Sequence, residues 1–328
     1  MTTFRFQAIS KYLPGKAIPS ETIEQIAGMR TGWVMKNSGV RFRHFAAETD
    51  SIASMTVKAL NCALDRSHRQ LADMDMLICA GGTYDQPIPY NACLVKQEMG
   101  AEQTRTHCFD VDATCLSFIV GLDVALAMME ARKLHGVALT TAEIASRSLN
   151  REDFKTFSLF GDAAVASIIE QSEEGFSFIG SHFENFCEGA RYAQVVAGGN
   201  RLLGFDPDAR REDFYFSMQG KKLLKATFQH LGDFFDHLEA KTGIPLHQYD
   251  MIIPHQASKF GNEFFIRKFG LKSENVYQGL KDYGNCISAS VALGLEECLN
   301  QGRIQKGDKV LLAGTAAGLS LGGIALQF

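Results

Sequence analysis

The chain has 328 residues, of which 46% are hydrophobic, and its formal net charge is −4 at pH 7. This length is enough for a large core in one or two domains, and the small net charge does not indicate binding to nucleic acid or to an anionic membrane. The N-terminus lacks the basic and then apolar layout of a signal peptide, and no run approaches the roughly 18 apolar residues of a membrane span. Because the eight cysteines have no paired spacing, we expect a protein of the reducing cytoplasm. From the lack of a long apolar run we also expect no membrane span.

Apolar runs typical of strands alternate along the chain with longer runs typical of helices. The predicted strands are residues 4–9, 76–80, 137–141, 163–169, 251–253 and 310–313. The predicted helices are residues 22–29, 51–65, 92–99, 116–132, 220–241 and 290–301. Such alternation predicts an α/β fold in which helices cover parallel sheets. A faint internal symmetry is also visible, because residues 157–170 and 314–328 each close with a glycine turn and an apolar strand.

One cysteine, Cys115, stands between a strand-like run at residues 107–111 and the apolar predicted helix at 116–132. The first amides of a helix have no partner within the helix, and the helix dipole there favours negative charge. We therefore expect the pKa of this thiol to fall below its ordinary value of about 8.5. Free cysteines are also common in protein cores, so the assignment as a nucleophile requires a base and a charge stabiliser elsewhere.

Candidates for both roles lie in the last third of the chain. His255 follows the predicted strand at 251–253, and Asn285 follows Gly284 in a turn before the predicted helix at 290–301. Each residue has an ordinary structural interpretation, a packed histidine in one case and a turn asparagine in the other. A cysteine with a histidine and an asparagine distant in sequence is nevertheless the pattern of a cysteine-nucleophile site.

No metal or nucleotide site is predicted. The sequence contains no CxxC, its nine histidines show no ligand spacing, and it has no GxGxxG or Walker motif. Residues 318–322 match the GxSxG of hydrolases, but that fold requires an Asp and a His after the Ser. Only six residues follow Gly322, and none of them is Asp or His.

Several motifs together resemble the ketoacyl-acyl-carrier-protein synthase III family. The Cys, His and Asn motifs are matched by residues 113–115, 254–258 and 283–285, and further matches are the tryptophan segment at 31–41, the Phe-Gly-Asp turn at 160–162 and the glycine-rich loop at 314–320. The resemblance spans nearly the whole chain. It implies the thiolase fold, in which two similar halves with mixed sheets covered by helices form αβαβα layers, usually as a homodimer. The halves would be residues 1–172, carrying the cysteine, and residues 173–328, carrying the histidine and asparagine.

The resemblance implies a decarboxylative Claisen condensation in fatty-acid or polyketide biosynthesis. Cys115 would take an acyl group from acyl-coenzyme A or an acyl carrier protein, while the backbone amides of Cys115 and Ala317 hold the oxyanion. A malonyl thioester, carried by coenzyme A or by acyl carrier protein, would then lose carbon dioxide. His255 and Asn285 would stabilise the resulting enolate. Fixed dipoles and sulfur chemistry suffice for this reaction, so no cofactor is expected.

Substrate delivery is implied in the same way. Positions that line the pantetheine tunnel in this family are matched here by Trp33, Phe160, Met218, Leu224, Ala257 and Ser258. Ile88, in the proline-containing loop at 81–91, would close the acyl pocket of the partner subunit. Asn37 and Phe154 stand where arginines are often found in the resembled family, so we expect a rearranged or weak coenzyme A clamp. Basic residues that would dock an acidic carrier protein, or else form ordinary solvated helix surfaces, are Lys221, Lys222, Lys225, Lys259, Arg267 and Lys268.

Two other functions are compatible with the sequence. One is a thiolase-fold acyltransferase, or a Claisen enzyme without decarboxylation, that also uses an acyl-Cys115 intermediate. The other is a non-catalytic partner of an active homologue. The intact Cys, His and Asn set argues against the non-catalytic partner. Asn285 favours condensation over acyl transfer, because some acyltransferase members of the resembled family differ at that position.

Overall fold

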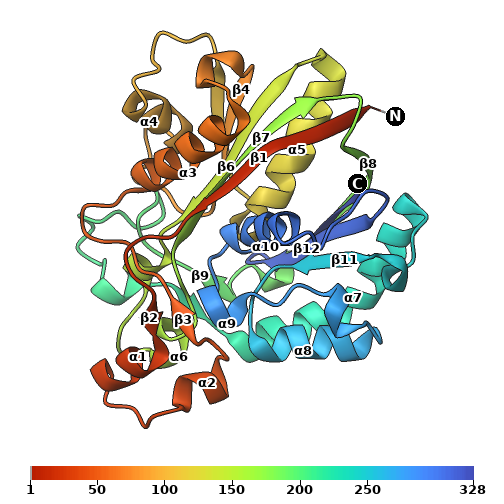
Figure 1. Ribbon diagram of the computed structural model, residues 1–328. Helices are drawn as coiled ribbons and strands as arrows, with labels where there is room; N and C mark the ends of the chain where they lie inside the picture. The colour runs from red at the N-terminus through yellow and green to blue at the C-terminus, as the bar shows by residue number, and fades with distance from the viewer. Residues whose placement is uncertain (1) are drawn as a thin grey trace.

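The computed structural model describes residues 2–328 and is organised by one nine-stranded mixed sheet in the order β11-β12-β13-β8-β1-β7-β6-β4-β5 (Figure 1). The strands are β1 (Thr3–Tyr12), β4 (Met76–Ala80), β5 (His107–Val111), β6 (Gly136–Glu143), β7 (Ala163–Gln171), β8 (Phe176–Asn185), β11 (Met251–Pro254), β12 (Lys309–Ala316) and β13 (Ser320–Gln327). Two small pairs lie outside it, namely β2 (Ile18–Pro19) with β3 (Phe42–Arg43), and β9 (Ala193–Gln194) with β10 (Ser217–Met218).

The pairing pattern repeats. In the first half β4 pairs parallel with β6, β6 antiparallel with β7, and β7 antiparallel with β1. In the second half β11 pairs parallel with β12, β12 antiparallel with β13, and β13 antiparallel with β8. The halves join through β1 and β8, where Thr3 pairs with Ser177 and Phe4 with Phe176. The predicted division at residue 172 lies in the turn between β7 and β8, and we propose that it separates two repeats.

Helices cover the sheet on its outer faces and also fill the space between the two halves. The helices are α1 (Ser20–Ile26), α2 (Trp33–Asn37), α3 (Ile52–Ser67), α4 (Asn91–Glu98), α5 (Ser117–Arg132), α6 (Phe154–Phe157), α7 (Gly220–Thr242), α8 (Lys259–Lys268), α9 (Leu280–Tyr283) and α10 (Ala289–Asn300).

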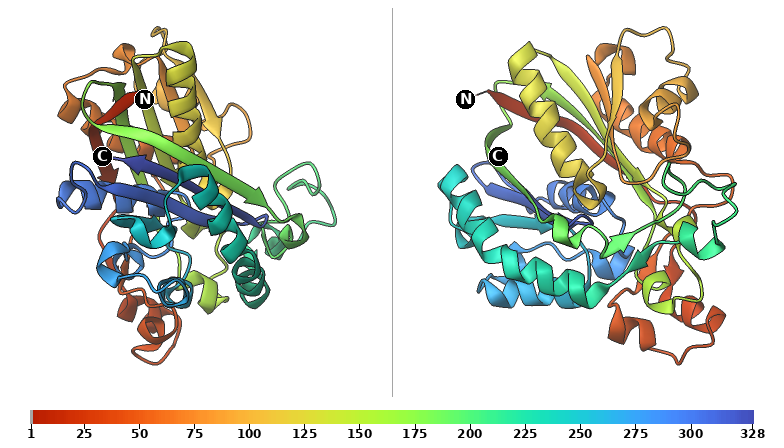
Figure 2. Two further views of the ribbon diagram at one scale, coloured as in Figure 1. Left: turned by 90° about the vertical axis from the view of Figure 1, so that its right-hand side faces the viewer. Right: turned by 180° about the vertical axis from the view of Figure 1, so that it is seen from behind.

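The predicted helix at 22–29 is wrong in its extent. Gly28 and Gly32 have φ of 64° and 83°, a left-handed backbone that ends α1 early and separates it from α2. Figure 2 shows both termini at one edge of the molecule.

Helix α5 is the most apolar helix and lies in the core. The window Thr114–Arg132 is long and apolar enough to cross a membrane by length and composition, so the expectation that no run approaches such a span was wrong. Half of this window is buried inside the structure. Phe118, Ile119, Leu122 and Met129 are fully buried in the largest hydrophobic cluster, which also contains α10 and strands of both halves. The apolar composition of α5 follows from packing on two sides.

Candidate active site

Cys115 lies in a single 3₁₀ turn, Thr114–Leu116, between the end of β5 and the start of α5. The turn is held by short local contacts. The Thr114 amide donates a hydrogen bond of 2.8 Å to Asp112 Oδ1, and the Ala113 amide donates one of 2.9 Å to Ser117 Oγ. Thr114 has φ of 51°, a left-handed conformation that is unfavourable for a β-branched residue. The strand-to-helix position predicted for the thiol is therefore present.

His255 comes directly after β11, where its amide donates a 2.8 Å hydrogen bond to the Ala313 carbonyl of β12. The side chain is buried, with 5% of its surface exposed. Gly314 allows this approach, because a Cβ at that position would lie 2.9 Å from His255 Cβ. The neighbouring strand thus fixes the ring, and a larger residue at position 314 would displace it.

Asn285 is held by the Phe-Gly-Asp turn from the other half of the chain. Its amide donates a 2.9 Å hydrogen bond to the Leu159 carbonyl, and its carbonyl accepts one of 3.1 Å from the Gly161 amide. Gly284, with φ of 71°, makes the preceding bend. A Cβ at Gly161 would lie 2.2 Å from the Tyr283 carbonyl oxygen. Glycine at position 161 is therefore required for the close approach of the two segments.

The structure brings Cys115, His255 and Asn285 together in the wall of one cavity of about 300 Å³. Of the other residues named from the sequence, Phe160, Met218, Ala257 and Ala317 also line it. A second, mainly apolar cavity of about 320 Å³ lies beside it, between α7 and α8, and shares His255, Met218 and Ala257. Leu224 and Ser258 line this second cavity.

Trp33 and Ile88 do not line either cavity within the single chain. The ring of Trp33 packs against Phe154 with 4.8 Å between ring centroids, so part of the indole surface predicted to meet adenine is covered. Ile88 is 85% exposed, and its role against a partner subunit stays a prediction.

The six basic residues predicted to dock a carrier protein are all exposed on α7 and α8, and none of them makes an ion pair among residues 2–328.

The expectation of a lowered thiol pKa was wrong. Burial raises the pKa of Cys115 to about 12, and the nearby Glu143 carboxylate adds to the shift, although the backbone amides of Ala317 and Cys115 oppose it. Desolvation and a negative neighbour therefore outweigh the dipole of the helix start. The same two amides were the ones predicted to hold an oxyanion, and both stabilise negative charge at the sulfur. Burial lowers the pKa of His255 to about 4, against a contribution from the Ile287 backbone, so the imidazole is neutral at pH 7.

Glu143, at the end of β6, is a buried acid that the sequence interpretation missed. Its carboxylate accepts hydrogen bonds from the Gly82 amide at 2.8 Å and the Thr83 hydroxyl at 2.7 Å, and also from the Ser288 hydroxyl. Burial raises the pKa of Glu143 to about 7, although these hydrogen bonds lower it. The only sign of Glu143 in the sequence was that an acidic residue stood at the end of an otherwise uncharged, strand-like run. This carboxylate ties the loop that carries Ile88 to the segment that follows Asn285.

Two similar halves joined through β1 and β8, with buried helices between them and a cysteine at a helix start, are the arrangement of a thiolase-fold protein. Family models for 3-oxoacyl-[acyl-carrier-protein (ACP)] synthase III and for its C-terminal part match residues 109–189 and 240–328. The chain belongs to this family of acyl-transferring condensing enzymes, which confirms the family and the fold predicted from the sequence.

Individual relatives agree over nearly the full length. The beta-ketoacyl-[acyl-carrier-protein] synthase III of Deinococcus deserti is 30% identical over 324 residues, covering 95% of this chain and 88% of the relative. That of Caldanaerobacter subterraneus subsp. tengcongensis is 29% identical, covering 94% and 93%. The crystal structure of 3-oxoacyl-[acyl-carrier-protein] synthase III from Aquifex aeolicus VF5 has a TM-score of 0.88 and 25% identity, covering 99% of this chain and 100% of that one.

Proposed function

We propose that this chain condenses a Cys115-bound acyl group with a malonyl thioester to give a 3-oxoacyl thioester. The observation that carries the proposal is the convergence of Cys115, His255 and Asn285, from three distant segments, on one cavity. The reaction for which the relatives are named supports the same proposal. We further propose that the protein acts in the cytoplasm, in fatty-acid or polyketide synthesis, and that its eight cysteines, all free in the structure, remain reduced.

In the first step Cys115 Sγ attacks the carbonyl carbon of an acyl thioester. A new carbon–sulfur bond forms, the donor thiolate leaves, and the proton of the Cys115 thiol passes to that leaving sulfur. The amides of Ala317 and Cys115 stabilise the oxyanion, a kind of contact that typically contributes about a hundredfold or more in rate. Because the pKa of Cys115 is high, we propose that the thiol loses its proton to the leaving sulfur during the attack and not before it.

In the second step the malonyl carboxylate leaves as carbon dioxide, and its electron pair forms an enolate. His255 and Asn285 are proposed to donate hydrogen bonds to the enolate oxygen. His255 Nδ1 is buried without a partner among residues 2–328, and a buried unpaired N–H is costly. We therefore assign the proton to Nε2, which leaves that atom as the donor. The carbanion then attacks the acyl carbon, and Cys115 leaves as the thiolate and takes a proton from solvent. The substrates and solvent supply every bond change, so the proposal calls on no cofactor.

We propose acyl carrier protein as a substrate carrier and a homodimer as the working assembly. The exposed lysines and arginine of α7 and α8 flank the apolar cavity that opens beside His255, and an acidic carrier would approach this basic surface readily. The contact of Trp33 with Phe154 leaves less indole surface for adenine, which favours carrier-bound over coenzyme A-bound donors.

Intact-mass spectrometry tests the proposed function. The protein is incubated with acyl-coenzyme A esters of increasing chain length, and in parallel with acyl carrier proteins, and malonyl-carrier protein is then added. We expect a mass gain that is absent in Cys115→Ser and that disappears as a 3-oxoacyl product forms. A stable adduct that malonyl thioester does not discharge would indicate acyl transfer to another acceptor. Unchanged turnover in Cys115→Ser would rule out the mechanism.

A further inference from the structure

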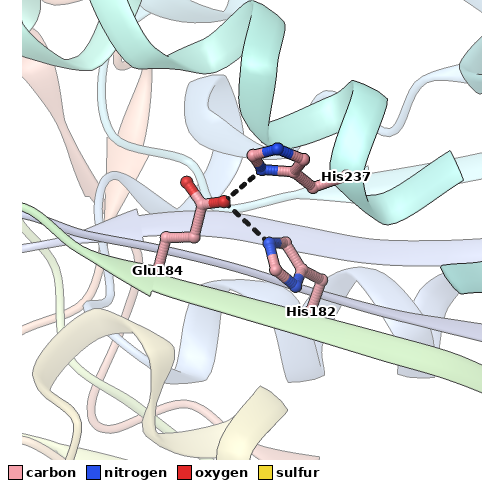
Figure 3. A group of neighbouring side chains, drawn as sticks. All are labelled: His182, Glu184 and His237. Carbon is pink, nitrogen blue, oxygen red and sulfur yellow. Dashed lines mark hydrogen bonds and ion pairs between the residues drawn. The ribbon is translucent and has the colours of Figure 1, made fainter. Parts of the chain in front are cut away.

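Three side chains with metal-binding atoms converge on the seam between strand β8 and helix α7, outside both cavities (Figure 3). His182 and Glu184 come from β8, two residues apart and on the same face, and His237 comes from α7. Figure 3 shows both imidazoles directed at one carboxylate oxygen. Glu184 Oε1 lies 2.8 Å from His182 Nε2 and 2.6 Å from His237 Nδ1.

The three ligand atoms lie within 4.8 Å of one another, and no other such group of His, Cys, Asp and Glu occurs in the part of the chain that the structure describes. The His182 ring is packed against two neighbouring rings. His182 stacks on Phe234 with 5.6 Å between ring centroids and meets His237 edge-on. Glu184 and His182 are about four-fifths covered, whereas His237 is 59% exposed. The site therefore has two largely covered ligands on β8 and one exposed, accessible ligand on α7.

We propose that His182, Glu184 and His237 bind a divalent transition-metal ion of the zinc class, with water at a fourth, open position. Two imidazoles and a carboxylate are a ligand set that suits zinc, whereas calcium and magnesium prefer oxygen ligands throughout. Ligands at about 2.1 Å from a tetrahedral ion lie roughly 3.4 Å apart. The His237–Glu184 contact of 2.6 Å must therefore open by about 0.8 Å, which rotation of the exposed His237 side chain allows. The His182–Glu184 contact of 2.8 Å must open by about 0.6 Å, which requires rotation of the Glu184 side chain.

The ligands have an ordinary alternative as a hydrogen-bonded triad. Burial opposes ionisation of Glu184, but hydrogen bonds from His182 and His237 lower its pKa, so the carboxylate is charged with or without a metal. A bound ion would replace two hydrogen bonds by coordination to the same three atoms. The two interpretations differ in whether zinc binds with a defined stoichiometry and in which substitutions abolish binding.

A metal at this seam would connect two elements that form walls of the active-site region. The first half of α7 supplies Leu223, Leu224 and Thr227 to the apolar cavity. Just beyond β8, Phe186 exchanges backbone hydrogen bonds of 2.7 and 3.1 Å with Leu319, two residues after Ala317. Because an ion that binds the folded state stabilises it, we expect zinc to hold α7 against the sheet and to raise the melting temperature.

The test uses full-length protein without a histidine tag, stripped of metal with a chelator. Zinc chloride is titrated by calorimetry, and melting temperature is followed against zinc concentration. We expect one ion per chain, a melting temperature that rises with zinc, and an affinity at least about tenfold weaker in His237→Ala and in Glu184→Gln. The matched control is His230→Ala, seven residues earlier on α7, because His230 has only one carboxylate partner, Glu188, at 3.3 Å. This control should bind zinc as the wild type does.

Cobalt(II) serves as a spectroscopic probe, because the free cysteines are also metal ligands. Cobalt at the proposed site should show d–d absorption without a thiolate-to-cobalt charge-transfer band, and this absorption should be lost in His237→Ala. Failure to bind one equivalent of zinc, equal affinity in His237→Ala and wild type, or a charge-transfer band that disappears in Cys115→Ser would each overturn the proposal. None of these outcomes depends on the condensing activity.

Discussion

Thr114 and Ile287 adopt the same left-handed backbone conformation, with φ of 51° and 49°. Each follows, at a distance of two residues, a polar side chain that accepts a hydrogen bond from its amide. Asp112 Oδ1 accepts from Thr114 at 2.8 Å, and Asn285 Oδ1 accepts from Ile287 at 2.9 Å. The two repeats therefore build the same turn at equivalent places, although one contributes the cysteine and the other the asparagine of the candidate site.

The equivalence continues into the helices that follow. The hydroxyl of Ser117 accepts from the Ala113 amide at 2.9 Å, and that of Ser290 accepts from the Cys286 amide at 3.0 Å. The position equivalent to Cys115 is then Ser288, whose hydroxyl donates to Glu143. One repeat thus places a nucleophile after the strained turn, and the other places a hydrogen-bond donor that fixes a buried acid.

Replacing Thr114 by glycine should stabilise the fold and impair the site. Glycine removes a left-handed conformation that costs of order 1 kcal/mol, and it also removes a buried hydroxyl that has no partner among residues 2–328. We expect the free energy of unfolding in urea to rise by about 1 kcal/mol, while acylation of Cys115 slows because its turn is less rigid. The matched control is His68→Gly, at φ of 54° after α3, which should stabilise without changing acylation. Slower acylation in both variants would contradict the claim that rigidity of the turn at Thr114 supports acylation of Cys115.

Gly161→Ala should be strongly destabilising. Its Cβ would lie 2.2 Å from the Tyr283 carbonyl oxygen, so one of the two segments that hold Asn285 must move. Overpacking and lost hydrogen bonds predict a loss of about 3 kcal/mol or more in the free energy of unfolding. Gly232→Ala, in helix α7 with nothing within 4 Å of the new Cβ, should instead be neutral or stabilising by up to about 1 kcal/mol. Similar melting temperatures for the two variants would contradict this packing argument.

The sequence was informative about the site because Cys115, His255 and Asn285 each stand where an element ends. A polar residue at such a place has no role in filling the core, so its identity is a signal of chemistry. The change from apolar to polar residues at these places also made β5, β11 and the start of α10 recognisable. The contacts that assemble these residues, such as the hydrogen bonds of Asn285 with Leu159 and Gly161, join distant segments and are not visible as a local pattern.

Other features could not be predicted from local patterns for identifiable physical reasons. Strand β8 was missed because apolar and polar residues do not alternate cleanly along its sequence. Gly180, His182 and Glu184 share the face covered by α7, where a Cβ at Gly180 would lie 3.3 Å from the Lys241 carbonyl. His237 lies 53 residues after Glu184, so no ligand spacing was present in the sequence. Glu143 looked like an ordinary strand end, since only the folded chain brings Ser288 to it.

Asn285→Ala should separate the two chemical steps. The side chain is proposed to meet the enolate oxygen and not the acylating carbonyl, so its loss should slow decarboxylation of malonyl thioester by about a hundredfold. Acylation of Cys115 should change little. Release of labelled carbon dioxide and intact-mass acylation, measured on the same samples, give the two rates. Equal losses in both rates would favour acyl transfer without decarboxylation.

Glu143→Gln should flatten the pH dependence of stability. The pKa of Glu143 is about 7 in the folded state, above its ordinary value of 4.5, so the folded chain holds this proton where the unfolded chain has lost it. Its contribution to stability is therefore greatest at low pH and declines as pH rises from about 4.5 to 7. In urea titrations from pH 5 to pH 8, the free energy of unfolding of the variant relative to wild type should increase with pH. Parallel curves would mean that this carboxyl does not titrate in that window, and Glu173→Gln, in an exposed turn, serves as the control.

The same substitution should activate the Cys115 thiol. Ionised Glu143 raises the pKa of Cys115, and this contribution is present only above the carboxyl pKa of about 7. A neutral glutamine that keeps the hydrogen bond with Ser288 should lower the thiol pKa, and one pKa unit corresponds to about a tenfold larger thiolate fraction. Alkylation of Cys115 by iodoacetamide, followed by intact mass, should then be several-fold faster in the variant at pH 8 to 9 and nearly equal to wild type at pH 6. A ratio that is independent of pH would indicate that Glu143 acts on Cys115 through packing and not through its charge.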